Sequence, residues 1–154
     1  MAEQLFWEDI KEGMELTPVA KVATSQMLVK WAGASGDFNP LHYEDAFAAG
    51  QGVGKPIVHG QLKRAWLVHL VTSWMGDEGT LKKFSCQFRG MDWPRPMKDL
   101  SEPLEGDTWG CKGTVTKKYT ADGEHLVDCE IWVENAQGEK TTPGSATIAL
   151  PSKG

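Results

Sequence analysis

The segment from Gln61 to Met75 places the strongest constraint on the fold, because it reads as a helix with almost no polar face. After Arg64 its residues are Ala-Trp-Leu-Val-His-Leu-Val-Thr-Ser-Trp-Met. A helix that is apolar all round is expected to be buried on nearly all sides. The rest of the chain therefore has to form a structure that surrounds this helix.

From Leu81 onward the hydrophobic pattern changes to a period of two, which is typical of strands. Turn-forming residues at 121–123 and 135–138 separate the alternating runs and predict hairpins. We therefore expect an α+β domain in which an antiparallel β-sheet wraps around the long helix. The alternating residues are Phe84, Cys86 and Phe88, then Trp109, Cys111, Gly113 and Val115, then Cys129, Ile131 and Val133, and finally Ala146, Ile148 and Leu150.

Shorter elements are expected before the long helix. The stretch from Met14 to Ala23 predicts an edge strand interrupted by Pro18. Thr24 or Ser25 can cap a helix that ends at Gly33, and residues 43–49 predict a second short helix that stops at a glycine-rich stretch. The apolar face expected for the first of these helices consists of Met27, Leu28, Trp31 and Ala32.

Between these two short helices lies a turn-rich loop that carries Asp37 and His42. Pro40 biases Asn39 away from helical backbone angles, and Gly36-Asp37 also favours a turn. A carboxylate beside an imidazole can move protons near neutral pH. Taken residue by residue, turn chemistry alone also explains an Asp and an Asn at such positions.

The whole string resembles the signature of the MaoC-like (R)-specific enoyl-CoA hydratases. That signature is written around Ser-Gly-Asp-x-Asn-Pro-Leu-His, with Phe-Ala a few residues later. Here residues 35–42 match throughout, and Phe47-Ala48 stands where the pattern expects it. A second family marker, the Ile-Val/Ala-His-Gly run before the long helix, is matched by Ile57-Val58-His59-Gly60. The resemblance extends from about Phe6 to Leu150.

The resemblance implies a hotdog fold, whose members usually pair two sheets edge to edge in a dimer. It also implies that Asp37 and His42 are the catalytic residues and that the Gly60 N–H binds the thioester carbonyl of the substrate. A helix start suits that oxyanion role, because its amides are unpaired and its dipole is positive. Ser35, Gly36, Asn39 and His59 are expected to support the site rather than react.

Two departures from the family pattern affect the site. Some members have a serine eight residues after Gly60 that bonds the catalytic Asp, but this chain has Val68. Lys63 and Arg64 stand in a helix turn that is usually apolar, where they could contact coenzyme A phosphates or an acidic carrier, or simply face solvent.

The connection from Arg89 to Gly106 is longer than the family pattern. It contains Trp93, which could line the acyl or coenzyme A pocket, and a surface excursion is the alternative.

The remaining histidines and the cysteines favour structural roles. His69 is expected to be a core histidine and His125 to be exposed. Cys86, Cys111 and Cys129 each fall on the apolar phase of a strand and predict small buried hydrophobic residues. The histidines lack metal-ligand spacing and no nucleotide-binding motif occurs, so neither a metal nor a cofactor is expected.

Composition fits one compact domain spanning residues 1–154. The chain is 40% hydrophobic, with a formal net charge of −5 and interspersed acids and bases. It therefore offers no basic stripe for nucleic acid or a membrane surface. No signal peptide or transmembrane run appears in the sequence, which favours the cytoplasm.

The function expected from these residues is (R)-specific hydration of trans-2-enoyl thioesters, or the reverse dehydration of (R)-3-hydroxyacyl thioesters. The acyl group would be carried on coenzyme A or acyl carrier protein, and a homodimer or a higher homo-oligomer is the expected assembly. One alternative is a subunit of a heteromeric hotdog dehydratase that completes the pocket of a partner chain. Another is an acyl-CoA thioesterase, because a fold does not fix the chemistry.

Overall fold

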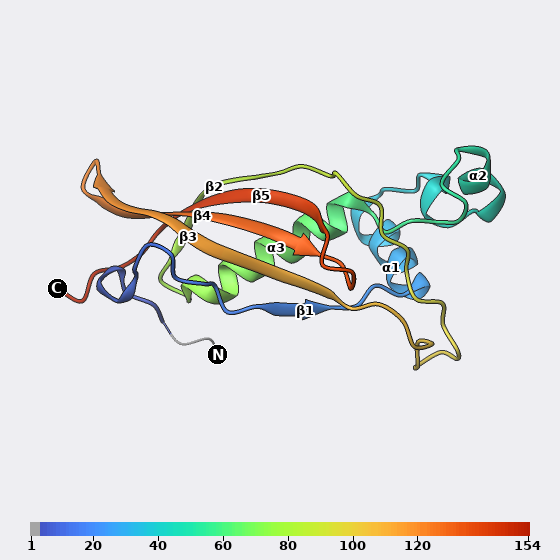
Figure 1. Cartoon of the computed structure of the whole chain (residues 1–154), viewed down its shortest axis with the longest axis horizontal. Helices are drawn as coiled ribbons and strands as arrows, with labels where there is room; N and C mark the ends of the chain where they lie inside the picture. The colour runs from blue at the N-terminus through green and yellow to red at the C-terminus, as the bar shows by residue number, and fades with distance from the viewer. Residues whose placement is uncertain (1–3) are drawn as a thin grey trace.

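The computed structural model describes residues 4–154, so residues 1–3 of the expected 1–154 domain lie outside the described residues. One five-stranded antiparallel sheet, in the order β1-β3-β4-β5-β2, curves around the helix α3. Figure 1 shows α1 and α2 gathered at one end of the molecule, beyond the sheet. The expected α+β architecture is confirmed. The elements are η1 (Trp7–Asp9), β1 (Val19–Lys21), α1 (Ser25–Ser35), η2 (Pro40–His42), α2 (Asp45–Gly50), α3 (Gly60–Met75), β2 (Thr80–Cys86), β3 (Trp109–Ala121), β4 (Glu124–Glu134) and β5 (Lys140–Ala149).

The helix α3 forms the centre of the hydrophobic core. Leu67, Leu70 and Val71 are completely buried against the inner face of the sheet. The expectation that α3 is buried on nearly all sides is wrong, because a strip that includes Arg64 and His69 is exposed. The sheet covers one side of the helix only, so α3 keeps one face open.

Among the described residues, no helix combines the length and apolar character needed to cross a bilayer.

The two hairpins predicted for the second half of the chain are confirmed. β3 pairs with β4 and β4 pairs with β5, both antiparallel, and β2 returns to pair with β5. The alternating residues of β3, β4 and β5 point into the core, as the period of two predicted. The buried ones are Trp109, Cys111, Val115, Cys129, Ile131, Val133, Ala146 and Ile148.

α1 begins where the sequence predicted and ends later. The side chain of Thr24 accepts a hydrogen bond from the Met27 amide at 3.1 Å, which is the geometry of an N-cap. Gly33 does not end the helix, which continues to Ser35. Gly36 takes the left-handed conformation (φ 75°) that closes the helix, and its N–H bonds to the Ala32 carbonyl.

β1 is shorter than expected. Only Val19–Lys21 pairs with β3, although Glu15 forms an isolated bridge to Thr114. Pro18 has no amide hydrogen to donate to the ladder, so regular pairing begins after it.

The connection between β2 and β3 runs alongside the end of the molecule that carries α1. The Arg95 amide donates to the Ala23 carbonyl at 2.8 Å, and the Ser25 amide donates to the Arg95 carbonyl at 3.1 Å. The Val58 amide donates to the Asp92 carbonyl at 2.8 Å. This connection is therefore fixed to the start of α1 and to the segment that leads into α3.

Candidate active site

The end of α1 fixes the backbone of Asp37. The Ser35 hydroxyl donates to the Trp31 carbonyl at 2.7 Å and accepts from the Asp37 amide at 3.2 Å. The Asp37 carboxylate in turn accepts from the Asn39 amide at 3.4 Å. Ser35 and Asn39 thus lie where supporting residues were expected.

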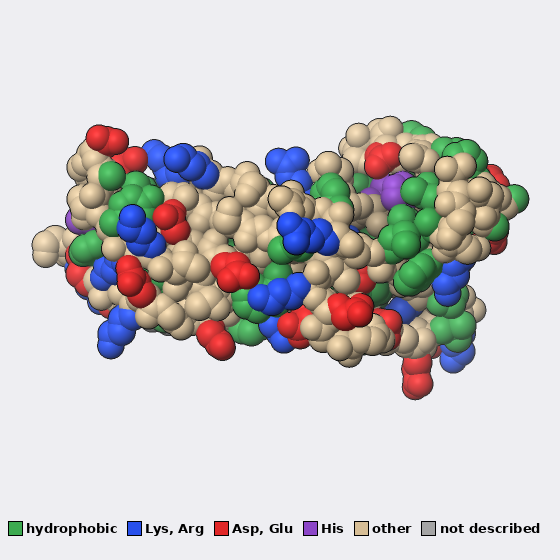
Figure 2. Space-filling view, turned by 45° about the horizontal axis from the view of Figure 1, so that its top comes forward, with side chains coloured by type: hydrophobic (Ala, Val, Ile, Leu, Met, Phe, Trp, Pro, Cys, Tyr) green, Lys and Arg blue, Asp and Glu red, His purple; other side chains and the backbone are tan. Residues whose placement is uncertain are grey.

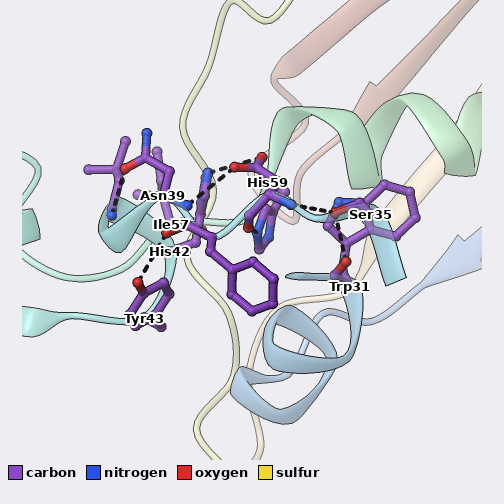
Figure 3. Close-up of polar contacts among 10 residues, drawn as sticks. Trp31, Ser35, Asn39, His42, Tyr43, Ile57 and His59 are labelled. Atoms are coloured by element: carbon purple, nitrogen blue, oxygen red, sulfur yellow. Dashed lines mark hydrogen bonds and ion pairs between the residues drawn. The ribbon is translucent and has the colours of Figure 1, made fainter. Parts of the chain in front are cut away.

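His42 closes the short helix η2, which Asn39 caps by accepting from the Leu41 amide at 3.0 Å. The Nδ1 atom of His42 lies 2.8 Å from the Ile57 carbonyl (Figure 3). Because a carbonyl oxygen only accepts, Nδ1 carries the hydrogen and donates it. In the neutral ring, Nε2 is then the free acceptor.

The free Nε2 of His42 lies 4.0 Å from a carboxylate oxygen of Asp37. The imidazole is 10% exposed and the carboxylate is 38% exposed. A separation of 4.0 Å exceeds a direct hydrogen bond but matches two acceptors that share a bridging water. The structure therefore brings together the two residues that the sequence singled out.

His59 and Gly60 stand beside this pair at the start of α3. The His59 ring stacks on His42, with centroids 3.7 Å apart, and its Nε2 donates to the Asp37 carbonyl at 3.3 Å. Burial of the ring, followed by the nearby His42, lowers the pKa of His59 below 6.5. Asp37, His42 and His59 each place one nitrogen or oxygen atom capable of binding a metal within 4.8 Å of the other two.

Gly60 is the first residue of α3, so its amide belongs to the turn whose N–H groups lack partners within the helix. A side chain at this position would meet the Phe88 ring, because a Cβ atom would lie 2.9 Å from it. Gly60, His42 and Phe88 line a cavity of about 220 Å³. The glycine therefore allows the Phe88 ring to approach the start of α3 closely.

A larger cavity of about 430 Å³ lies on another side of His42. Figure 2 shows histidine atoms in a hollow at the end of the molecule that carries α1 and α2, flanked by hydrophobic side chains. Pro94 and Pro96 bring the 87–108 connection into the wall of this cavity. The other lining residues are Ser25, Leu28, Val29, Tyr43, Asp45, Lys55 and Pro56.

Lys63 is buried, so the alternative in which it faces solvent is wrong. Its ammonium group donates to an Asp92 carboxylate oxygen at 2.6 Å and to the Gly90 carbonyl at 2.8 Å. Both charged side chains are 2% exposed. Lys63 lines the 220 Å³ cavity, but its charge is already paired inside the protein.

Arg64 and Trp93 line cavities whose lining residues do not include Asp37 or His42. Arg64 is exposed, and its guanidinium lies 5.8 Å from the centre of the Phe84 ring. Trp93 is 40% exposed, donates to the Val53 carbonyl at 3.3 Å and lines a third cavity of about 300 Å³. His42 is not among the residues that line this third cavity.

The other two histidines differ from expectation. His69 is exposed on the open strip of α3 rather than buried in the core. His125 is half-buried, because it stacks on Trp7 with ring centroids 4.6 Å apart.

Two of the three cysteines are buried as expected. Burial raises the pKa of Cys111 and Cys129 to about 12 in each case. Cys86 is only half-buried.

Ile57 lies in the second family motif, but it contributes to the site through its backbone carbonyl, which any residue possesses. Two further residues contribute although no sequence pattern indicated them. Asp92 comes from an irregular segment in which no hydrophobic period indicates burial. Tyr43 braces the loop by donating its hydroxyl hydrogen to the Phe38 carbonyl at 3.0 Å; its place two residues before α2 gave no indication of that contact.

Solved structures with the same architecture include two (R)-hydratases. The (R)-hydratase from A. caviae involved in PHA biosynthesis is 23% identical, with a TM-score of 0.76 over 94% of this chain and 99% of that one. The unliganded R-hydratase from Pseudomonas aeruginosa is 21% identical, with a TM-score of 0.80 over 99% and 89%. The ChsH1-ChsH2 complex from Mycobacterium tuberculosis gives a TM-score of 0.73 at 19% identity, over 91% and 98%. These likenesses establish the shared hotdog fold.

Sequence comparison identifies the family. Fatty acid synthase subunit beta of Gibberella zeae is 35% identical over 69 residues, which make up 44% of this chain and 3% of that much longer protein. The family model of the MaoC like domain matches residues 8–96, which is more than half of the 154 residues. This match includes Asp37, His42 and Gly60, and the chain therefore belongs to the family of MaoC-like dehydratase domains.

Proposed function

We propose that this protein hydrates trans-2-enoyl thioesters with (R) specificity and, in reverse, dehydrates (R)-3-hydroxyacyl thioesters. The observation that carries the proposal is the 4.0 Å separation between the Asp37 carboxylate and the free Nε2 of His42, beside the start of α3. The family and the fold of the two (R)-hydratases support the same reaction class.

The pair is suited to hold one water molecule. An ionised carboxylate and the unprotonated Nε2 are both acceptors, so each can take one hydrogen of the same water. The water oxygen then bonds to C3 of the enoyl group. One proton passes from the water to the pair, and the pair returns a proton to C2, so the protein ends in its starting protonation state.

Negative charge develops on the thioester oxygen as the C3–O bond forms. We assign the Gly60 N–H and the positive end of α3 to this oxygen, because preorganised donors at such an oxyanion contribute roughly 2.7–4 kcal/mol. Gly60 and His42 line the same 220 Å³ cavity, which supports placing the carbonyl and the water side by side. The reaction needs proton transfer only, so it requires no metal or organic cofactor.

The larger cavity is the proposed site of the acyl chain. Its volume of about 430 Å³ lies in the range of roughly 300–1,000 Å³ typical of small-molecule sites. Leu28, Val29 and three prolines supply an apolar wall that suits a hydrocarbon chain. The chain is carried on coenzyme A or on acyl carrier protein, and Arg64 and Trp93 remain candidates for carrier contacts near the surface.

A homodimer is the proposed assembly, and β1 and β2 are the two edges of the sheet available for pairing. A heteromeric subunit is the second candidate, because a neighbour of the same fold is the ChsH1-ChsH2 complex. The heteromer reading predicts that this chain alone is inactive and that a second hotdog chain restores activity.

The test is to incubate the purified protein with enoyl-CoAs of short, medium and long chain and to identify the products. The proposal expects loss of the enoyl absorbance, no release of free coenzyme A thiol and (R)-3-hydroxyacyl-CoA as the product. Thiol release would instead identify a thioesterase. Inactivity with all chain lengths, both as coenzyme A and as acyl-carrier-protein thioesters, would refute a self-sufficient hydratase.

A further inference from the structure

His59 is a completely buried imidazole that the proposed reaction does not use. It immediately precedes α3, and its ring lies at 20° to the plane of His42 with centroids 3.7 Å apart. Figure 3 shows His42 and His59 next to each other near the start of α3. The position gives His59 contact with both members of the proposed catalytic pair.

The hydrogen bond of His59 fixes its tautomer. Its Nε2 lies 3.3 Å from the Asp37 carbonyl and must donate, because that oxygen only accepts. Its Nδ1 is buried without a hydrogen-bond partner among the described residues, which suits an unprotonated nitrogen. The ring thus holds one proton in a fixed place.

The surroundings of His59 favour this neutral form. Burial is the main influence that lowers the pKa of His59, and His42 adds to it, whereas the hydrogen bond to the Asp37 carbonyl and, after it, the Asp37 carboxylate raise that pKa. From α3, the Lys63 ammonium is balanced by Asp92 of the 87–108 connection. If His42 is protonated, a positive charge on the stacked His59 ring would be repelled. His59 therefore stays neutral while His42 gains and loses the proton.

We propose that His59 is a positioning residue: its neutral Nε2–H holds the backbone of Asp37, and its ring face sets the plane of His42. The inference rests on the proposed hydratase function. His59 thereby restrains the Asp37 backbone together with the Ser35 hydroxyl, which accepts from the Asp37 amide.

Two substitutions separate the two contacts. His59→Phe keeps a ring to stack on His42 but loses the donor to Asp37, and His59→Gln keeps a donor but loses the stack. We expect each to lower kcat for crotonyl-CoA by about tenfold or more, because small misplacements of reacting groups cost up to about 100-fold. KM should stay within about twofold, because neither contact binds substrate directly.

His69 provides the matched control, since it is an exposed histidine on α3. His69→Phe and His69→Gln should keep the wild-type kcat. The inference is overturned if both His59 variants of an active protein keep wild-type kcat, or if kcat falls only in proportion to the folded fraction. A wild-type protein without hydratase activity would instead refute the proposed function.

Nitrogen-15 NMR of the wild-type histidine rings tests the geometry independently of activity and of variant folding. We expect His59 as the neutral Nε2–H tautomer at pH 7, still neutral at a pH at which a solvent-exposed histidine is charged. A charged His59 ring or an Nδ1–H tautomer at pH 7 would overturn the proposal.

Discussion

Backbone carbonyls decide which nitrogen of each site histidine is free. The Ile57 carbonyl accepts from His42 Nδ1, and the Asp37 carbonyl accepts from His59 Nε2. The nitrogen left as an acceptor is therefore Nε2 in His42 and Nδ1 in His59. The free nitrogen of His42 lies 4.0 Å from the Asp37 carboxylate. These contacts underlie the proposal that His42 transfers protons and His59 supports the site.

The buried state of His59 predicts how stability depends on pH. Its pKa is lowered in the folded protein, so below about pH 6.5 the unfolded chain binds more protons and the free energy of unfolding falls with falling pH. His59→Gln removes this contribution, so denaturant unfolding from pH 7.5 to pH 5 should show a shallower loss in the variant. An equally steep loss in both proteins would show that His59 does not titrate differently in the folded state.

The cysteines should differ in reactivity because their burial differs. Burial raises the pKa of Cys111 and Cys129 to about 12 and raises that of Cys86 in the same direction, while only Cys86 is partly exposed. Iodoacetamide at pH 8 should label Cys86 slowly and leave the other two unlabelled until the protein unfolds. Peptide mass mapping checks this, and labelling of Cys111 in the folded protein would contradict it.

The residues proposed to act in the reaction could be identified from sequence, but several of their contacts could not. Asp37, His42 and Gly60 lie in two short motifs with recognisable residue types. The Ile57 carbonyl and the stack of His59 on His42 depend on how two distant segments meet. No residue type or spacing reports such a contact before the fold is known.

Among the elements, α3 and the connection that follows β2 are joined by the buried Lys63–Asp92 ion pair. Gly90 accepts from the same ammonium group, and the Val58 amide donates to the Asp92 backbone. Residues 88–91, which form one wall of the 220 Å³ cavity beside Gly60, are thus fixed to the first turn of α3. A buried ion pair matters most when one member is lost, because the other charge then stays buried without a partner.

Lys63→Met is therefore expected to lower the free energy of unfolding by roughly 3–5 kcal/mol. The double variant Lys63→Met/Asp92→Leu should recover most of that loss, because no unpaired charge remains. Chemical denaturation of wild type, both single variants and the double variant measures the coupling. A double variant as unstable as the sum of the single variants would show that the pair is not coupled.

Elements were predictable where a single local rule governed them. Thr24 capped α1 as expected, and the turns at 121–123 and 135–138 formed hairpins. The end of α1 was misplaced because Gly33 fits inside a helix, whereas Gly36 is the residue with positive φ. His69 was misplaced because an apolar sequence cannot show which side of α3 the sheet leaves open.

At the scale of the molecule, the sheet and α3 form the hydrophobic core, and segments at one end form the 430 Å³ cavity. The 430 Å³ cavity combines residues from α1, from the loop around η2 and from the 87–108 connection. Its existence was not predictable, because these three segments come together only in the folded chain. The fold class itself followed from one buried helix and a run of alternating strands.

Filling this cavity should change the preferred acyl chain length. Val29 lines it and is 63% exposed, so Val29→Trp can occupy space without disturbing the core. We expect kcat/KM for longer enoyl-CoAs to fall by about tenfold or more while crotonyl-CoA is hydrated within about twofold of the wild-type rate. Lys30→Trp, exposed on the same helix and not among the lining residues of this cavity, is the control. An unchanged chain-length profile would place the acyl chain elsewhere.

The most direct test of the account measures crotonyl-CoA hydration by wild type, Asp37→Asn, His42→Ala and the double variant. Each single variant should lose about 100-fold or more in kcat, and the double variant should lose little beyond the worse single variant, because the two residues act on one water. Asp77→Asn and His69→Ala, at exposed positions, should keep full activity. If wild type is active and either Asp37→Asn or His42→Ala keeps activity within about threefold of it, a water shared by the Asp37–His42 pair is not the basis of catalysis.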